Sequence, residues 1–116
     1  MKELEPKIRR GSVYWVNGRL YGQTIDKDRP YLIVSNWKCN KYSPHVIGVP
    51  VTTRDKKEMP THVPLWGGQT ALCEMVVTIP RDYVRELTGH CTKMEMKQVE
   101  NALEVALGLD ITKALA

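Results

Sequence analysis

The feature that most constrains this chain is a succession of short, apolar, β-branched segments ahead of one capped amphipathic helix. Three segments have the composition of strands and are bounded by glycine, proline or other turn residues: Ser12–Val16, Tyr31–Ser35 and His45–Thr52. Strands this short are stable only when several of them pair. The pattern therefore predicts a small, strongly bent β-barrel with the helix packed against it.

Two further segments are predicted to be strands, and each contains one unusual residue. Thr61–Leu65 includes Pro64, which cannot donate to a ladder, so this strand is expected at an edge or a bulge. Ala71–Ile79 is predicted to be one longer strand with Glu74 in its middle. A carboxylate inside an apolar strand either faces solvent or has a polar partner.

The remaining segments before the helix are predicted to be turns and loops. Pro80 suits the start of a short helical turn that runs to about Arg85, and a short strand is expected around Leu87–Cys91. Turn residues and charges dominate the expected loops, which are Asn17–Arg29, Trp37–Pro44, Arg54–Pro60 and Trp66–Gln69.

The C-terminal helix has the clearest local signals in the chain. Thr92 and Glu95 stand at the spacing of a capping box, in which each side chain bonds the other residue's backbone amide. Gly108 supplies the C-terminal stop. One apolar stripe at helical spacing comprises Met96, Val99, Leu103 and Ala106. If this stripe packs within the chain, it leaves no surface for a dimer interface.

Length and composition indicate a single domain, residues 1–116. The chain has 116 residues, 42% of them hydrophobic, which is enough for one core. No apolar run approaches the ~18 residues that a membrane helix needs. The N-terminal segment MKELEPKIRRG has no apolar core of a signal peptide, so a cytoplasmic protein is expected, with no membrane partner.

The cysteines favour neither a disulfide scaffold nor a metal site. Cys39, Cys73 and Cys91 are odd in number and far apart, and no CxxC pair or suitably spaced histidine accompanies them. They are expected to be buried small hydrophobic residues in a reducing compartment. No metal and no cofactor are predicted.

The charge is distributed unevenly along the chain. Residues 1–60 carry 12 lysines and arginines against 6 acidic residues, whereas residues 61–116 carry 5 against 7. A basic front half suits a polyanionic partner, but a formal net charge of +4 also occurs in proteins that bind no nucleic acid.

Polar groups at strand ends are the candidates for chemistry. Arg29 precedes the second strand, and its planar guanidinium suits the two free oxygens of a phosphodiester. Thr52 ends the third strand and has a hydroxyl that can bond the same phosphate. The alternative remains open that Arg29 is an exposed strand-entry residue and Thr52 only a good strand former.

The histidines and tryptophans have both functional and structural interpretations. His45 and His62 are each possible general bases, although a lone histidine in a strand is more often structural. Tryptophans can stack on nucleic-acid bases. Trp15 alternates with strand residues and is expected in the core. Trp66 precedes two glycines and is expected to be exposed, and Trp37 lies in a predicted loop.

The order of the motifs is more specific than any one of them. The chain runs through RRGSVYWV, DRPYLIVSN, VIGVPVTT, PTHVPL, ALCEMVVTI and ALEVALGL. From about Ile8 to Leu109 this order resembles the MazF/PemK family of toxin–antitoxin endoribonucleases. The resemblance implies a small SH3-like barrel, similar to MazF and CcdB, with a C-terminal helix. It also implies a homodimer that binds single-stranded RNA.

The resemblance assigns roles to particular residues. Arg29 matches an arginine that acts on the scissile phosphate as acid/base or electrostatic stabiliser, and Thr52 matches a threonine that completes the phosphate site. The RNA's own 2′-OH is the expected nucleophile, leaving a 2′,3′-cyclic phosphate and a 5′-OH, without a metal. The residues expected to bind substrate are Gln23, Thr24, Asn36, Thr53 and Glu74.

The chain departs from the family pattern near these residues. Thr24 stands where the family has an acidic residue, and Asp26–Asp28 replaces a glycine pair and its neighbour. Met75 and Val77 replace a glutamine and an arginine that often contact RNA or antitoxin, and Ser12 replaces an aspartate. The catalytic pair is kept while the RNA-reading surface differs, so the family's sequence preference does not transfer to this chain.

Three functional hypotheses follow. In the first, the chain is an RNA-cleaving toxin held in check by an antitoxin whose disordered acidic tail folds over the RNA groove, with DNA contacted only through that complex. In the second, it is a non-catalytic RNA- or DNA-binding module on the same fold. In the third, it is a gyrase-directed inhibitor, although the tail 110–116 lacks the aromatic ending expected for that contact.

Overall fold

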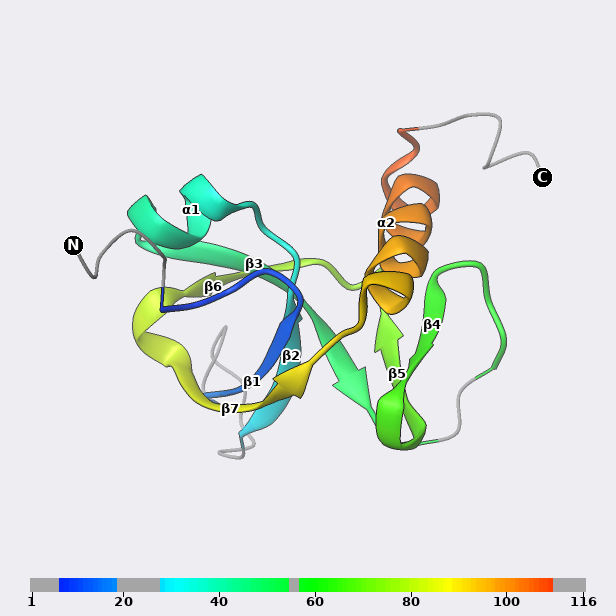
Figure 1. Cartoon of the computed structure of the whole chain (residues 1–116), viewed down its shortest axis with the longest axis horizontal. Helices are drawn as coiled ribbons and strands as arrows, with labels where there is room; N and C mark the ends of the chain where they lie inside the picture. The colour runs from blue at the N-terminus through cyan, green and yellow to red at the C-terminus, as the bar shows by residue number, and fades with distance from the viewer. Residues whose placement is uncertain (1–6, 19–27, 55–56, 110–116) are drawn as a thin grey trace.

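The computed structural model describes residues 7–18, 28–54 and 57–109, and these form a bent antiparallel sheet with one long helix against it (Figure 1). The strands are β1 (Ser12–Val16), β2 (Arg29–Ile33), β3 (His45–Thr52), β4 (His62–Leu65), β5 (Gln69–Leu72), β6 (Val77–Pro80) and β7 (Val84–His90). The α-helices are α1 (Trp37–Tyr42) and α2 (Lys93–Leu107), and two 3-10 turns are η3 (Trp66–Gly68) and η4 (Arg81–Tyr83).

The strand order makes β3 the centre of the sheet. The order is β4-β5-β3-β2-β1-β7, and β6 pairs with β3 off this path. The first half of β3, His45–Gly48, pairs with β6, and its last two residues pair with β5. A barrel-like sheet followed by a C-terminal helix confirms the fold class predicted from the sequence. No helix among the described residues is long and apolar enough to cross a membrane.

Three predicted elements are confirmed with small shifts. β1 and β3 have the predicted bounds, while β2 begins and ends two residues earlier than expected. It ends early because the amides of Val34 and Ser35 both donate to the Ile47 carbonyl, which turns the chain toward α1. The short strand expected near residue 87 is the longer β7, and η4 is the helical turn expected after Pro80.

The prediction of one strand over Ala71–Ile79 is wrong. The chain turns at Cys73 and Glu74, where the Met75 amide donates to the Leu72 carbonyl at 3.0 Å. The turn separates β5 from β6, and the two strands pair with opposite ends of β3. Because Glu74 lies at this turn, its carboxylate is not inside a strand and has polar partners of its own.

The prediction of a loop over Trp37–Pro44 is also wrong, because α1 occupies most of it. The Asn36 side chain caps this six-residue helix by accepting from the Cys39 amide at 2.8 Å. At the other end, Arg81 donates from Nε and Nη2 to the Ser43 carbonyl at 3.2 and 2.9 Å, and from Nη2 to the Asn40 carbonyl. A distant arginine therefore stabilises a helix too short to have a visible apolar period.

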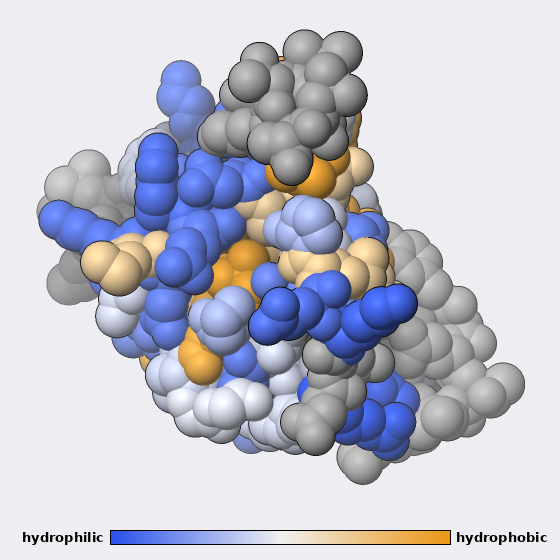
Figure 2. Space-filling view, turned by 90° about the vertical axis from the view of Figure 1, so that its right-hand side faces the viewer, coloured by the Kyte–Doolittle hydropathy of each residue, from blue (hydrophilic) through white to orange (hydrophobic). Residues whose placement is uncertain are grey.

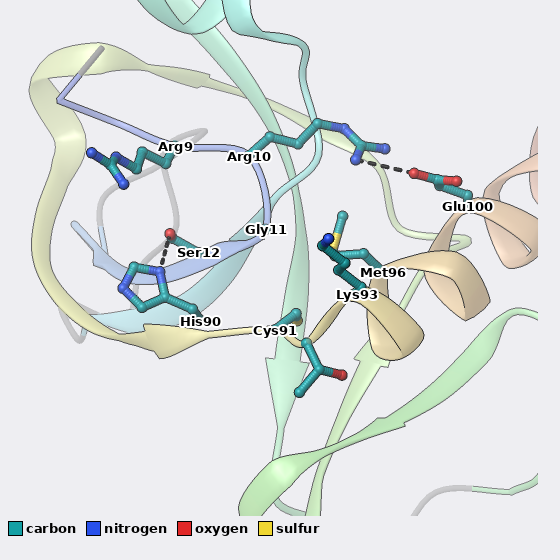
Figure 3. A pocket seen from close by; sticks show the side chains of 10 residues that line it. Arg9, Arg10, Gly11, Ser12, His90, Cys91, Lys93, Met96 and Glu100 are labelled. Carbon is teal, nitrogen blue, oxygen red and sulfur yellow. Dashed lines mark hydrogen bonds and ion pairs between the residues drawn. The ribbon is translucent and has the colours of Figure 1, made fainter. Parts of the chain in front are cut away.

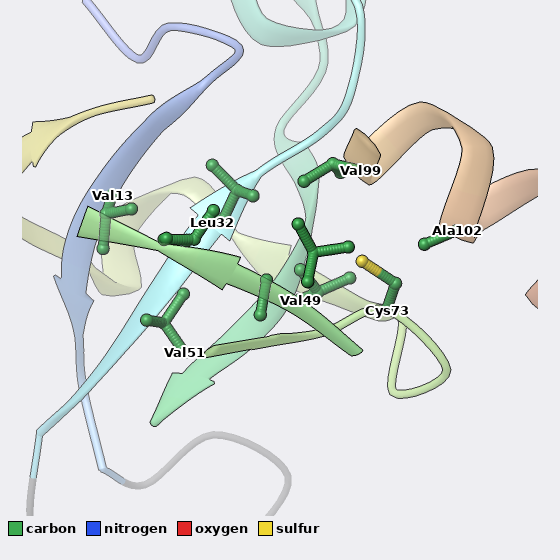
Figure 4. Close-up of a cluster of buried hydrophobic side chains, with 10 residues drawn as sticks. Val13, Leu32, Val49, Val51, Cys73, Val99 and Ala102 are labelled. Carbon is green, nitrogen blue, oxygen red and sulfur yellow. The ribbon is translucent and has the colours of Figure 1, made fainter. Parts of the chain in front are cut away.

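The sheet is buried on both faces. Successive residues of one strand enter different clusters: Leu32 packs with α2, whereas Tyr31 and Ile33 face the other side. The cluster shared with α2 contains Val13, Leu32, Val49, Val51, Val63, Leu65, Ala71, Cys73, Val99 and Ala102 (Figure 4). The second contains Ile8, Tyr14, Val16, Tyr31, Ile33, Val46 and Ile79. Trp15, expected in the core, is instead 41% exposed and belongs to neither cluster.

Helix α2 has the predicted caps. The Glu95 amide donates to Thr92 Oγ1 at 3.0 Å, and the Thr92 amide donates to Glu95 Oε1 at 2.7 Å. Gly108 ends the helix with φ of 67°. Val99 is fully buried and Met96 and Leu103 pack against the same cluster. Three residues of the apolar stripe therefore pack within the chain, and the fourth, Ala106, is half-buried outside this cluster.

Trp66, expected to be exposed, is half-buried and packs against the first cluster. Its ring lies over β7, so that a Cβ added at Gly89 would stand 2.7 Å from a Trp66 ring carbon. Real Cβ atoms do not approach other atoms this closely, so only glycine fits here without displacing the ring.

We therefore predict that Gly89→Ala lowers the free energy of unfolding by roughly 1–3 kcal/mol, the usual cost of overpacking. Thr88→Ala is the matched control, since Thr88 is the exposed neighbour on the same strand. Thermal unfolding followed by circular dichroism measures both variants. Equal melting temperatures for Gly89→Ala and the wild type would contradict the packing of Trp66 on β7.

Candidate functional site

Arg29 and Thr52 lie at a fork between two strands of the sheet. β2 and β3 pair from Ile33, which lies opposite Gly48, to Tyr31, which lies opposite Pro50. The Tyr31 and Pro50 pair is the last rung of their ladder. Beyond that rung β3 pairs with β5, placing Thr52 opposite Thr70. The start of β2 instead continues along β1, with Arg29 opposite Val16. Figure 1 shows β2 and β3 diverging at this end.

The alternation of side chains puts both candidates on one face of the sheet. Arg29 shares a face with Tyr31, and Thr52 shares a face with Pro50. Because Tyr31 and Pro50 are cross-strand partners, the side chains of Arg29 and Thr52 project from the same face of the sheet, one on each side of the fork. Tyr31 is buried, Thr52 is half-buried and Arg29 is exposed.

These two groups are suited to bind a phosphodiester that enters the fork. The exposed guanidinium offers a planar set of N–H donors that matches two phosphate oxygens. The Thr52 oxygen already accepts from the Arg54 amide at 3.1 Å, which orients the hydroxyl and leaves its proton to donate. Thr53 is exposed directly after Thr52 and extends the same edge.

The other residues predicted to bind substrate do not gather at this fork. Gln23 and Thr24 lie outside the described residues. Asn36 lies at the opposite end of β2 from Arg29, and its side-chain oxygen caps α1. Glu74 follows β5 at the end away from Thr70 and bonds Thr61 and His62. The strand register thus places Arg29 and Thr52 on one face of the sheet, on either side of the fork, and Thr53 follows Thr52 directly in the chain.

A second polar site lies where the N-terminal arginines meet α2 (Figure 3). This pocket of about 410 Å³ contains Ser12, whose buried Oγ is 2.6 Å from His90 Nδ1. Arg10 donates to the Val34 carbonyl at 3.1 Å and pairs with Glu100 at 3.2 Å. These contacts join β1 to β7, and the segment before β1 to α2.

The surface around α2 and β4 also has an apolar groove. Its volume is about 410 Å³, and its lining includes Pro60, Val63, Pro64, Ala102 and Val105. On this side of the molecule the hydrophobic surface forms small areas between hydrophilic side chains (Figure 2).

Among the described residues, no group of three or more metal-ligating side chains is present. Cys73 is buried as predicted, whereas Cys39 and Cys91 are half-buried, and all three thiols are free. Burial raises the pKa of Cys73 and of Cys91 to about 12, with smaller contributions from Glu74 and Glu95 respectively. Both thiols are therefore protonated and inert near neutral pH.

Comparison with known proteins assigns the family. The family described as "PemK-like, MazF-like toxin of type II toxin-antitoxin system" matches residues 9–107. The chain belongs to this toxin family. It is also similar to "Endoribonuclease MazF" of Staphylococcus saprophyticus, with 32% identity over 111 residues that cover 88% of this chain and 92% of the relative.

Solved structures agree with the fold of this toxin. An endoribonuclease in complex with its cognate antitoxin, from a mycobacterial species, has a TM-score of 0.77 and 27% identity, covering 89% of this chain and 97% of the other. A MazE–MazF structure from Deinococcus radiodurans has a TM-score of 0.73 and 22% identity, covering 87% and 95%. The second likeness shows the fold alone.

A hydrogen-bonded network around Glu74 was not predicted from the toxin's sequence. The Glu74 carboxylate accepts from Thr61 Oγ1 at 2.8 Å and lies 3.0 Å from His62 Nε2. His62 Nδ1 is 2.7 Å from the Lys57 carbonyl, so both ring nitrogens face acceptors. The network joins the start of β4 to the turn between β5 and β6. The sequence indicated only that a carboxylate in an apolar segment either faces solvent or has a polar partner.

This network lowers the pKa of Glu74. Desolvation acts to raise the pKa, but hydrogen bonds from His62, the backbone and Thr61, with the charge of His62, together outweigh it. The carboxylate therefore favours the folded state at pH values above its unfolded pKa. That contribution is lost as the pH falls through the lower folded pKa.

We predict that Glu74→Gln destabilises the toxin at pH 7, and that the difference from the wild type shrinks as the pH falls below about 4.5. Urea unfolding at a series of pH values measures this difference. Glu58→Gln is the control, because Glu58 is an exposed carboxylate. A difference that grows on acidification would refute the assigned role of the Glu74 network.

Proposed function

We propose that this toxin is an endoribonuclease that cleaves single-stranded RNA at the fork between β2 and β3, without a metal. The observation that carries the proposal is the placement of Arg29 and Thr52 on one face, on either side of the fork. The similarity to a curated endoribonuclease at 32% identity supports the same activity. The basic front half of the chain suits a polyanionic substrate.

The proposed reaction uses the RNA's own 2′-OH as nucleophile. Its oxygen attacks the neighbouring phosphorus and gives up its proton to solvent water, while the bond from phosphorus to the 5′ oxygen breaks. The leaving oxygen takes a proton from solvent, so that the products carry a 2′,3′-cyclic phosphate and a 5′-OH. Negative charge grows on the phosphoryl oxygens as the new bond forms.

Arg29 and Thr52 act on that developing charge. The Arg29 guanidinium bonds the non-bridging oxygens and stabilises them more strongly as charge accumulates, which is the property that accelerates a reaction. The Thr52 hydroxyl, held by the Arg54 amide, donates to the same phosphate. Exposed Thr53, together with Gln23 and Thr24 from outside the described residues, is proposed to contact the flanking nucleotides.

The proposed partners follow from the family. A solved relative is bound to its cognate antitoxin, and we propose that an antitoxin likewise inhibits this toxin, with DNA contacted only through that complex. A homodimer in the cytoplasm completes the proposal. The tail on which the gyrase alternative rested lies outside the described residues.

We predict that Arg29→Ala slows cleavage by roughly 10²–10³-fold or more, the loss found when one transition-state donor is removed. Arg29→Lys keeps the charge but loses the planar fork, so it recovers only part of the rate. Thr52→Val, which removes the hydroxyl while keeping the shape, is also expected to slow the reaction. Thr53→Val is the matched control for Thr52, with a smaller effect.

The measurement is single-turnover cleavage of a long single-stranded RNA in EDTA, with mapping of 5′-OH ends. Full activity in Arg29→Ala would refute the assigned mechanism. Intact RNA that the wild type binds but does not cut would instead support a non-catalytic binding module. The Met75 side chain, half exposed where the family has a glutamine, is the feature that favours that alternative.

A further inference from the structure

The outer face of α1 carries an exposed group of aromatic and basic side chains. Trp37 is 46% exposed and Tyr42 is 70% exposed, and Lys38 and Lys41 lie on the same face at helical spacing. The inner face contains the fully buried Asn40. No acidic residue occurs in the helix. We call Trp37, Lys38, Lys41 and Tyr42 the α1 platform.

The platform side chains are arranged against one another. The rings of Trp37 and Tyr42 are 6.2 Å apart between centroids and meet edge to face at 77°. Lys41 Nζ lies 4.9 Å from the centroid of the Trp37 ring and 5.5 Å from that of Tyr42. A single ammonium group therefore lies beside two exposed rings, which combines positive charge with flat apolar surface.

The helix that carries the platform is held firmly on the barrel. Asn36 caps its first turn, and Asn40 Nδ2 donates to the Ser35 carbonyl at 2.8 Å inside the protein. Arg81 fixes the last turn through the Ser43 carbonyl. None of these contacts involves the platform side chains, so they can engage a ligand without weakening the attachment of α1.

Single-stranded RNA is the ligand whose chemistry fits this surface. Every base has a face that stacks on an aromatic ring, and lysines beside the rings attract the phosphates. Large exposed aromatic side chains contribute little to folding and commonly mark binding surfaces. The absence of carboxylates from α1 removes the repulsion that a nucleic acid would otherwise meet.

The platform lies far from the proposed cleavage site. α1 connects the end of β2 to the start of β3, whereas Arg29 and Thr52 lie at the opposite ends of these strands (Figure 1). The eight residues of β3 span about 25 Å at ~3.3 Å per residue. An RNA strand bound at the fork must extend over a comparable distance to contact α1 as well.

We propose that the α1 platform is a second RNA-binding site, which stacks a base on Trp37 or Tyr42 and binds an adjacent phosphate through Lys38 and Lys41. This inference rests on the proposed ribonuclease function, and it names an extended single strand as the preferred substrate. The platform acts on binding and not on the chemical step. Removing it therefore raises KM for long RNA and leaves kcat and the cleavage of short RNA unchanged.

The test compares labelled RNAs of 5 and 20 nucleotides, bound to protein that also carries Arg29→Ala so that no RNA is cut. Adding Trp37→Ala and Tyr42→Ala is expected to weaken 20-nucleotide binding by roughly 5- to 100-fold, the effect of removing the stacking of one base. Binding of the 5-nucleotide RNA is expected to stay the same. Trp37→Phe, which keeps an aromatic face, is expected to restore part of the affinity.

Two further measurements separate the possible outcomes. Lys38→Gln with Lys41→Gln should lower the slope of log affinity against log salt by about 0.7 for each phosphate that the protein no longer neutralises. Sedimentation of Trp37→Ala/Tyr42→Ala should match the wild type. Dissociation of a dimer in that variant would overturn the proposal and make the platform a protein interface. Equal affinity of wild type and variant for the 20-nucleotide RNA would also overturn it.

The two proposals fail in different ways. If the wild type binds long RNA through Trp37 but never cuts it, the ribonuclease function fails and the platform stands. If the wild type cuts RNA through Arg29 and the platform variants keep the wild-type KM on long RNA, the ribonuclease function stands and the platform fails.

Discussion

The structure depends on the change of partner along β3. Its first half is tightly enclosed between β2 and β6, where Gly48 leaves no room for a side chain: an added Cβ would lie 3.0 Å from both Ile79 Cδ1 and the Leu32 carbonyl oxygen. Pro50 marks the last rung with β2 and has no N–H to extend that ladder. Beyond Pro50, the end of β3 pairs with β5 instead of β2. This change of partner allows one short sheet to have a buried cluster on each face.

The same change of partner creates the candidate site. The pairing of β2 with β1 positions Arg29, and the pairing of β3 with β5 positions Thr52. These backbone pairings do not require a contact between the two side chains. A site fixed in this way tolerates changes in the side chains around it. The departure from the family at Val77 is therefore compatible with an unchanged fold, since β6 pairs with β3 through its backbone. Met75 lies in the turn before β6, where its backbone amide makes the hydrogen bond to Leu72.

Local sequence signals predicted the elements that depend on local interactions. The bounds of β1 and β3 and both caps of α2 follow from β-branched runs, Thr92, Glu95 and Gly108. Elements that depend on distant partners were not predictable: α1 needs Arg81, and the turn between β5 and β6 accompanies contacts from Thr61 and His62 to Glu74. Likewise, the sequence nominated Arg29 and Thr52, but only the strand register places them on one face.

Two features of the surface bear on how this toxin recognises RNA under the two proposals. At Met75 and Val77 the chain lacks side chains that hydrogen-bond bases or phosphates, and α1 presents two exposed rings beside lysines. Hydrogen bonds to base edges discriminate between bases, whereas stacking accepts all of them. Under the two proposals, this toxin would hold long single strands with little dependence on their sequence, and selectivity would be confined to the few nucleotides at the fork.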